Sequence, residues 1–494
     1  MGGQTTGPKR GRTSRRWIFL SAGIAALAAL WCATSLWGGG YFVPAPWTTL
    51  ADTAALLIQA STWKQILITL LRILAGFLAG YLAGALCGTA MGSRVELNAF
   101  FKPLILFFQG MPPLLWAIPL VVAMGIGHAP AIAVIALITT PVVAVTVAEG
   151  MGSLPRAYRE MLNVFAPGLW PRLKELTFPH LRPFLSAALN VGLVLAVKAS
   201  VTAEYFGAND GIGFQIQSAY QSLQIRRLFS WGAVLVLLII LGNRLVPRIR
   251  LIAPALQRLL HKDVPPACST ENIGKLKAIF TSRKSSPRMA VHGLSFSYPD
   301  CGPVLSNVSI TVRSGQIAVI SGDSGVGKTT LLKLLASLLA PTSGRVECPS
   351  GIGFVFQDDR LLPWKSVTAN TALPLVHQGF PLKDSLCFAS YLLGEAGLGG
   401  EGEKKPDELS GGMRKRAALA RCFARIPEAI LLDEPFSGLH REARRQLWEK
   451  LLHLLELHPV PVLMATHFPE EVAETPGCRF FELRGRPAVL VPRE

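Results

Sequence analysis

The chain has 494 residues, of which 50% are hydrophobic and only 16% are charged. A typical soluble protein has about 25% charged residues, so this composition, with a mean hydropathy of +0.39, excludes a disordered, collagen-like or wholly soluble chain. The formal net charge of +18 suggests nucleic acid or an anionic membrane surface as a partner. The eight cysteines include no CxxC pair and therefore indicate neither a zinc site nor a disulfide framework.

Long apolar segments are concentrated in the first 250 residues. Each is close to the roughly 20 residues with which a helix crosses a bilayer. The third contains Gly110, Pro112 and Pro113, which predict a kinked or broken helix. After a basic tail at 1–16, the sequence therefore predicts a transmembrane domain at 17–250. Its six predicted spans are 17–37, 65–91, 100–125, 129–147, 183–203 and 229–246.

The basic residues predict the orientation of these spans, because Lys and Arg collect on the cytoplasmic side. They cluster in the N-terminal tail, between the fourth and fifth spans, and after the sixth span, whereas the outer segments contain only Lys64, Arg226 and Arg227. The N-terminus is therefore expected in the cytoplasm, and nucleic acid loses support as a partner. Residues 9–37 could alternatively be a cleaved signal peptide, which would leave the later spans oriented as before.

A linker is expected at 251–288, and a soluble α/β domain at 289–494. The segment from Gly322 to Thr329 fits GxxxxGK[ST] between an apolar strand at 317–321 and a helix at 330–339. Its amides would hold phosphate oxygens, Lys328 would reach the β- and γ-phosphates, and Thr329 would bind Mg²⁺. The expected ATP contacts are Gly322, Asp323, Ser324, Gly325, Val326, Gly327, Lys328, Thr329 and Thr330.

A buried strand near residue 430 ends in two carboxylates, Asp433 and Glu434. Asp433 is expected in the Mg²⁺ shell, and Glu434 is expected to orient or deprotonate the attacking water. A strand that merely ends in solvated acids is the competing interpretation.

The segment 409–414, which contains Ser410, Gly411 and Gly412, resembles the LSGGQ signature of ATP-binding cassette (ABC) ATPases, with Met413 in place of Gln. The resemblance covers 289–494 and implies that this signature contacts ATP held by a partner subunit. It also implies adenine stacking, a Mg²⁺ and coupling contact, and a γ-phosphate contact, carried respectively by Tyr298, Gln357 and His467.

Two departures from that family lie near these motifs. His440 replaces the acid of the D-loop, which puts communication between the two ATP sites in doubt, and Phe468 replaces an acid that often follows the switch histidine.

Six spans joined to an ABC ATPase also describe a half-exporter, but exporter helices extend far into the cytoplasm and this chain has only short loops. The loop between the fourth and fifth spans resembles the EAA loop of importers: Glu160 and Pro179 match, whereas Met161, Leu162 and Ala166 depart. That resemblance implies a short helix that docks on the ATPase near Gln357. A basic amphipathic surface helix is the alternative.

Further segments resemble permeases of the nitrate, sulfonate and taurine branch, which also includes thiamine-precursor and riboflavin importers. They are Val43 to Pro46, Arg72, Pro112 and Pro113, Ala203 and Glu204 followed by three glycines, and Leu362 to Trp364. Lys198, inside the fifth span, and Glu204 are candidates for the substrate path, because ionisable residues in a membrane are commonly functional. Lys198 could equally pair with a carbonyl or a carboxylate within the bundle.

These observations predict a type I importer-like domain of six transmembrane helices followed by an α/β P-loop ABC ATPase with a helical subdomain. The expected function is ATP- and Mg²⁺-dependent uptake of a small anionic or vitamin-like solute across the cytoplasmic membrane, with the ATPase inside. The expected partners are a second copy or a related half-transporter, an extracytoplasmic binding protein and membrane lipid, but no nucleic acid. A lipid or drug half-exporter and a membrane-anchored regulatory ATPase remain as alternatives.

Overall fold

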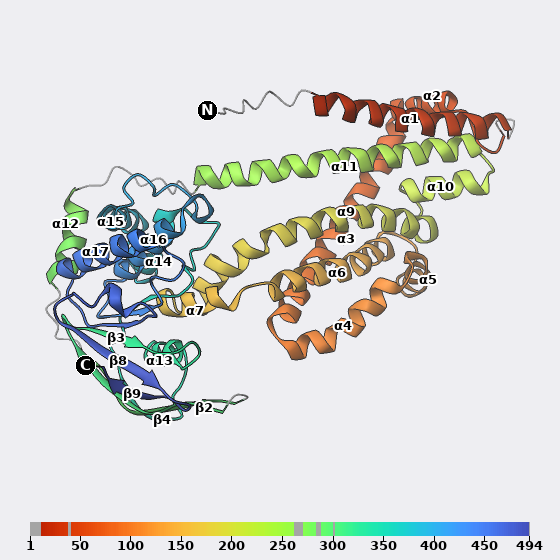
Figure 1. Cartoon of the computed structure of the whole chain (residues 1–494). Helices are drawn as coiled ribbons and strands as arrows, with labels where there is room; N and C mark the ends of the chain where they lie inside the picture. The colour runs from red at the N-terminus through yellow and green to blue at the C-terminus, as the bar shows by residue number, and fades with distance from the viewer. Residues whose placement is uncertain (1–10, 38–40, 261–269, 283–287, 300–301, 494) are drawn as a thin grey trace. The chain divides into compact units, whose positions relative to one another are not determined.

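The computed structural model describes residues 11–37, 41–260, 270–282, 288–299 and 302–493 (Figure 1). The chain forms two compact units. The first comprises Met1–Ser153 and Leu181–Pro254, and the second comprises Leu154–His180 and Ala255–Glu494. The loop between the fourth and fifth predicted spans therefore belongs to the same unit as the ATPase.

The first unit is helical, and each predicted span overlaps a helix. Its helices are α1 (Gly11–Trp37), α2 (Pro46–Ile58), α3 (Ala60–Ser93), α4 (Val95–Gly110), α5 (Pro113–Met124), α6 (His128–Gly152), α9 (Phe178–Gly207, entered from the second unit), α10 (Ile212–Gln221) and α11 (Ile225–Leu260).

Four helical segments in the described residues are long and apolar enough to cross a membrane: Ala60–Ser93, His128–Gly152, Leu169–Gly207 and Ile225–Gly242. The third predicted span is broken, because α4 and α5 meet at a bend of 95° (Figure 1). Pro113 opens α5 at the bend, as expected for a residue that cannot donate a backbone hydrogen bond. Counting this pair as one span gives five, and α1 contributes a shorter apolar helix, so the predicted count of six is not reproduced.

Glycines at every fourth position of α3 let it pack closely against α6. A Cβ atom added to Gly84 would lie 2.6 Å from the carbonyl oxygen of Thr140, and one at Gly88 would lie 2.4 Å from that of Ala144. Small residues spaced in this way allow membrane helices to approach backbone to backbone. The same contact recurs along the pair at Gly76, Gly80 and Gly92.

The second unit contains two sheets. A three-stranded antiparallel sheet has the order β2–β1–β4, and a six-stranded sheet has the order β5–β6–β7–β3–β8–β9, with only β9 antiparallel (Figure 1). The strands are β1 (Arg288–Tyr298), β2 (Gly302–Arg313), β3 (Ile317–Ser321), β4 (Ser343–Glu347), β5 (Ile352–Val355), β6 (Ala429–Asp433), β7 (Val462–Ala465), β8 (Cys478–Arg484) and β9 (Val489–Pro492).

The parallel register determines where the chemistry collects. Asp433, the last residue of β6, pairs with Ala465 at the end of β7, and Ala465 pairs with Ile320 of β3. Because parallel strands end at one edge of a sheet, ligands bind beyond that edge. The P-loop after β3, the two acids of β6 and His467 after β7 therefore meet there.

Helices surround this sheet. They are α12 (Thr270–Ser282), α13 (Lys328–Leu335), α14 (Val367–His377), α15 (Leu382–Glu395), α16 (Gly411–Ala424) and α17 (Arg441–Leu457), with short 3-10 turns at Pro406–Glu408 and Pro469–Glu471. Helices α14, α15 and α16 pack on one another as a helical subdomain. The expected linker at 251–288 contains the end of α11 and α12, whose Leu276 and Phe280 are buried in the ATPase core.

The segment Leu154–His180 forms α7 (Arg156–Phe165), α8 (Leu169–Pro171), a π-helical turn (Arg172–Thr177) and the first residues of α9. Met161, Leu162 and Phe165 are buried in one cluster with Phe354 and Phe356 of the ATPase. The two positions at which the EAA pattern departs from alanine therefore bury apolar surface, which favours docking by about 25 cal/mol per Å².

Candidate functional site

The P-loop Lys328 lies at the N-terminus of α13 with its ammonium turned back into the loop. Its Nζ donates to the carbonyl oxygens of Gly322 at 2.7 Å and Asp323 at 3.1 Å, and lies 3.2 Å from Nε2 of His467. Burial lowers the pKa of Lys328, although the nearby acids oppose this effect. Gly327, with φ +116°, makes the turn that aligns the loop amides ahead of α13.

Two oxygen donors suited to Mg²⁺ lie side by side. The Thr329 hydroxyl donates to Oδ1 of Asp433 at 2.9 Å, across the gap between the P-loop helix and β6. Burial raises the pKa of Asp433, opposed by this hydrogen bond and by Lys333, Arg360 and Lys328. A hydroxyl and a carboxylate next to a phosphate-binding loop are oxygen ligands of the kind that Mg²⁺ prefers.

Glu434 is strained and only partly satisfied. Its backbone has φ +48°, a left-handed value that is uncommon for a residue other than glycine and is often found at functional sites. Oε2 accepts from the His467 amide at 3.2 Å, while Oε1 faces Nε2 of His467 at 3.3 Å and Nζ of Lys328 at 3.9 Å. Burial raises the pKa of Glu434, opposed by His467 and Lys328.

Tyr298 and Gln357 are placed differently. The Tyr298 hydroxyl lies 3.4 Å from Oγ1 of Thr330, so Tyr298 contacts the P-loop helix. The Gln357 side chain is exposed, and in the described part of the chain only its backbone oxygen is engaged, by Lys415. In the described residues, no hydrogen bond joins the Gln357 side chain to Thr329 or Asp433.

The signature lies away from the P-loop of its own chain. The Ser410 hydroxyl caps α16 by accepting from the Met413 amide, and Ser410 and Gly411 are exposed. Gly411 lines a cavity of about 490 Å³ with Gln357 and Gly438. A different cavity, of about 510 Å³, is lined by P-loop residues Asp323, Ser324 and Val326 together with Glu482–Arg486.

His440, the residue that departs from the D-loop pattern, caps α17. Its Nδ1 accepts from the Ala443 amide at 3.3 Å, which is the bond that an aspartate would make at the same position. The substitution therefore preserves the start of this helix.

The predicted coupling residue Glu160 is bound on both sides. Oε1 accepts from Nζ of Lys333 at 3.0 Å, and Oε2 accepts from Nη1 of Arg360 at 2.9 Å. Burial of Glu160 is outweighed by these two cations, which lower its pKa. Lys333 lies on α13 behind the P-loop, and Arg360 lies three residues after Gln357.

The other two loop positions are structural. Ala166 is buried and closes α7 through its amide. Its φ of −146° is open to any residue, so the glycine of the EAA pattern is not needed there. Gly168, two residues on, has φ +126° and makes the turn instead. Pro179 lies in the first turn of α9, where proline is tolerated.

A second carboxylate of this loop was not predicted. Glu175 lies 2.8 Å from Nζ of Lys365 and 3.7 Å from Nε2 of His377, and Trp364 donates from Nε1 to its backbone oxygen at 3.0 Å. Burial of Glu175 is outweighed by the neighbouring His377 and Lys365, which lower its pKa to about 2.

Arg421 links three of these parts and was also not predicted. Its guanidinium is fully buried and donates to the backbone oxygens of Arg360 at 2.7 Å and Asp359 at 2.8 Å, with its centre 5.1 Å from the Phe165 ring. Burial lowers its pKa to about 10, so it stays charged at neutral pH. The signature helix, the segment after Gln357 and the loop therefore share one cation.

The first unit contains a buried ionic cluster. Arg72 donates from Nη1 to Oε1 of Glu204 at 3.0 Å, pairs with Asp210 through Nη2, and donates from Nε to His128 at 3.0 Å. Oε2 of Glu204 accepts from Thr69 at 2.9 Å.

Three successive amides at the start of α10 bind to side chains of the same region. The Gly211, Ile212 and Gly213 amides donate to Gln65, Thr69 and Glu204 respectively. A Cβ at Gly211 would lie 2.6 Å from the Glu204 carboxylate. Both oxygens of Glu204 are engaged and its side chain is fully buried, so it lies inside the bundle rather than on an open path.

Lys198 is exposed on α9, and the described residues offer its ammonium no partner.

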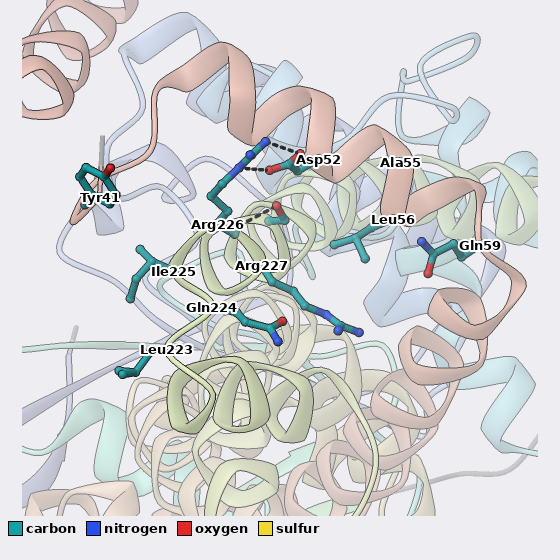
Figure 2. Close-up of a pocket in the computed structure, with 11 residues that line it drawn as sticks. Tyr41, Asp52, Ala55, Leu56, Gln59, Leu223, Gln224, Ile225, Arg226 and Arg227 are labelled. Atoms are coloured by element: carbon teal, nitrogen blue, oxygen red, sulfur yellow. Dashed lines mark hydrogen bonds and ion pairs between the residues drawn. The ribbon is translucent and has the colours of Figure 1, made fainter. Parts of the chain in front are cut away.

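A separate cavity of about 660 Å³ lies between α2 and the start of α11. There Arg226 forms a two-bond pair with Asp52, at 2.9 Å for each bond, whereas Arg227 points away from Asp52 (Figure 2).

Comparison with known proteins agrees with both halves of this arrangement. Residues 305–437 match the ABC transporter family model, and residues 76–252 match the model described as a binding-protein-dependent transport system inner membrane component. The aliphatic sulfonates import ATP-binding protein SsuB 1 of Paracoccus denitrificans (strain Pd 1222) is 40% identical over 191 residues, which are 38% of this chain and 76% of that protein. The chain belongs to the ABC transporter family.

Two further relatives of this ABC transporter are import proteins. The taurine import ATP-binding protein TauB of Pseudomonas putida is 38% identical over 36% of this chain and 71% of its own length. The formylaminopyrimidine import ATP-binding protein ThiZ of Halalkalibacterium halodurans (strain ATCC BAA-125 / DSM 18197 / FERM 7344 / JCM 9153 / C-125) is 37% identical over 36% of this chain and 72% of its own length.

These matches confirm the central prediction. The ABC transporter joins an inner membrane permease component and an ATP-hydrolysing domain in one chain, of the import type to which sulfonate and taurine systems belong. The half-exporter alternative loses its support, because the permease model describes a binding-protein-dependent system.

Proposed function

We propose that two copies of this ABC transporter, or one copy and a related half-transporter, use ATP to take up a small anionic solute of the sulfonate class. The observation that supports this proposal most concerns Glu160. Its two carboxylate oxygens accept hydrogen bonds from two different cations, Lys333 and Arg360. It ties a loop that leads directly into a membrane helix to the P-loop helix and to the segment after Gln357.

The geometry of the ATP site supports the following proposed catalytic roles. Lys328 and the P-loop amides hold the phosphates, and Tyr298 supports the adenine. Glu434 accepts a proton from the attacking water through Oε1, the oxygen that lacks a hydrogen bond in the described residues. A raised pKa brings this base closer to the working pH. His467 keeps Glu434 in place and contacts the γ-phosphate.

Mg²⁺ is proposed as the required cation. Thr329 and Asp433 would hold it, and Gln357 would join after moving inward. When bound, Mg²⁺ supplies neutralisation of phosphate charge. The phosphates of ATP are expected to complete the shell.

The two separate cavities support a dimer. Since the P-loop and the signature of one chain line different cavities, ATP held by one copy is placed to meet Ser410, Gly411 and Gly412 of the other. Each helix start offers free amides that favour an anion. Closure over two ATP molecules would then draw the loops of both copies together.

The choice of an anionic solute rests on two cations. Lys198 is exposed on α9 with no partner for its ammonium among the described residues, and Arg227 lines the cavity between α2 and α11, on the predicted outer side, where the neighbouring Arg226 is paired with Asp52. The names of two relatives point to sulfonates and taurine, while a third names formylaminopyrimidine. A vitamin-precursor solute is therefore the second candidate.

An extracytoplasmic binding protein is proposed to deliver the solute, as the matched permease model describes. The ATPase is proposed to lie in the cytoplasm, because Lys and Arg collect in the loops on the cytoplasmic side of a membrane protein. A regulatory ATPase without cargo would show ATP hydrolysis but no accumulation.

The test is uptake by the full-length chain in proteoliposomes that contain ATP and Mg²⁺, with a candidate extracytoplasmic binding protein added outside. Labelled taurine, an aliphatic sulfonate and formylaminopyrimidine serve as probes. Uptake that requires both internal ATP and external binding protein is the expected result. ATP hydrolysis without accumulation of any probe would contradict importer activity, and uptake of formylaminopyrimidine alone would contradict the sulfonate class.

A further inference from the structure

The loop Leu154–His180 contains two carboxylates that bind different parts of the ATPase, the half-buried Glu160 and the buried Glu175. Glu160 on α7 pairs with Lys333 of α13, the helix that carries the P-loop lysine. Glu175 pairs with Lys365, two residues before α14, and with His377, the last residue of α14. One carboxylate is therefore bound to the nucleotide-binding core and the other to the helical subdomain.

Glu175 is held as firmly as Glu160. Its side chain is only 9% exposed, and its backbone oxygen accepts from Trp364. The Trp364 ring lies 6.2 Å from the Tyr158 ring and 6.3 Å from that of His180, so it contacts the loop on both sides of Glu175. A charged group buried to this degree is stable only with partners, and Lys365 and His377 supply them.

The chain between the two anchors contains a bend. Gly168 adopts φ +126°, and the segment Arg172–Thr177 that carries Glu175 is a π-helical turn, a rare conformation that is frequent at functional sites. If the helical subdomain turns relative to the core, the two anchors must separate or rotate, and the bend takes up the difference.

We propose that Glu175 is a positioning residue that ties the second half of this loop to the helical subdomain. Rotation of that subdomain against the P-loop core then reaches α9 as a turn of the loop rather than a simple displacement. The inference rests on the proposed function, in which this loop carries the movement of the ATPase to the membrane helices.

The first test measures whether loop and helical subdomain move together. Spin labels at Trp170 and Lys383, both exposed, report their separation in the full-length chain in phospholipid nanodiscs. A Glu434→Gln background prevents turnover, and Mg²⁺-ATP is the probe. With Glu175 intact, the distance distribution is expected to stay narrow and unchanged on addition of ATP. In Glu175→Gln it should broaden or shift, and an unchanged distribution in that variant overturns the proposal.

The second test uses a charge exchange. Glu175→Lys places like charges beside Lys365 and is expected to lower the number of solute molecules moved per ATP by about tenfold, with basal ATP hydrolysis in detergent within about twofold of wild type. Glu175→Lys with Lys365→Glu restores the pair and should recover most of the ratio, and Glu175→Asp should recover part. Glu449→Gln, in an exposed pair on α17, is the matched control.

These outcomes distinguish a failure of the Glu175 proposal from a failure of the proposed importer function. A wild-type ratio in Glu175→Lys, or no recovery in the exchanged pair, overturns the role of Glu175 while the importer function stands. If the wild-type chain gives no ATP-dependent uptake of taurine or a sulfonate, the proposed function fails, and the spin-label distances still decide whether Glu175 fixes the loop to the subdomain.

Discussion

Oε1 of Glu434 lies 3.3 Å from Nε2 of His467 and has no hydrogen-bond partner in the described part of the chain. The other oxygen, Oε2, is fixed by the His467 amide. One carboxylate is therefore both anchored and available, which is the arrangement that a general base requires, since it must be positioned and yet keep a free lone pair.

Replacing Glu434 with Gln should leave ATP binding intact and nearly stop hydrolysis. The amide keeps the shape and can still accept from the His467 amide, but it cannot take a proton. General base catalysis contributes about 10²–10⁴-fold, so the turnover number should fall by at least about a hundredfold. Steady-state hydrolysis and nucleotide binding by the full-length chain measure this effect, with Glu449→Gln as control. A turnover number within a few-fold of wild type would rule out Glu434 as the base.

On the acid side of its pH profile, the turnover number should begin to fall at a pH above the usual pKa range of a carboxylate. Burial raises the pKa of Glu434, and the charges of His467 and Lys328 partly oppose it. Because the base acts in its ionised form, the turnover number should fall as pH drops through this raised pKa, above the usual value of about 4.3. In His467→Gln the residual activity should begin to fall at a still higher pH, because His467 no longer lowers the pKa of Glu434. If the activity of that variant fell at the same pH as in wild type, Glu434 would not be the general base.

A bulky side chain in the glycine row of α3 should prevent assembly of the membrane unit. The Cβ of Gly84→Val would lie 2.6 Å from the Thr140 oxygen and 2.7 Å from Cβ of Val143, and backbone atoms cannot move aside cheaply. Overpacking costs about 1–3 kcal/mol or more. Gly152→Val on α6 is the control, because no atom lies within 4 Å of its Cβ. Thermal unfolding in detergent compares the two, and equal melting temperatures would contradict close packing of α3 and α6.

Most of the ATP site could be predicted from the sequence, because its motifs are local. The P-loop and the acids after β6 are short segments whose chemistry follows from residue type and spacing. The register of parallel strands then brings Thr329 to Asp433 and Glu434 to His467. Gln357 is the exception: its role was inferred from resemblance, and its side chain is exposed.

The partners of the loop could not be predicted, because they are distant in sequence. Glu160 meets Lys333 and Arg360 only after the loop has docked on the ATPase. Glu175 carried no motif, and Trp364 indicated a branch of the family rather than a contact. The glycine row of α3 was in principle visible, since a four-residue spacing of small residues in an apolar helix is a known packing signal.

The same limit applies to Glu204, which the sequence placed on a candidate substrate path. The structure gives it Arg72, Thr69 and the Gly213 amide as partners. An unpaired ionisable residue in the membrane interior destabilises a protein. The four members of this cluster come from three separate segments, so sequence spacing alone cannot predict that they meet.

This cluster predicts that Arg72→Met alone is less stable than the double variant that also carries Glu204→Gln. Arg72→Met leaves Glu204 buried and unpaired, and breaking a buried pair in this way costs about 3–5 kcal/mol. In Arg72→Met with Glu204→Gln, the neutral amide can still accept from Thr69 and from the Gly213 amide, while Asp210, whose side chain is 35% exposed, can turn to solvent. The double variant should therefore recover much of the lost stability.

Thermal unfolding of the three proteins in detergent measures this recovery, and Arg226→Gln serves as control because its pair with Asp52 is exposed and exposed pairs contribute about 0–1 kcal/mol. A double variant that melts no higher than Arg72→Met would mean that Glu204 is not stabilised chiefly by Arg72. In that case Arg72 would act mainly through Asp210 and His128.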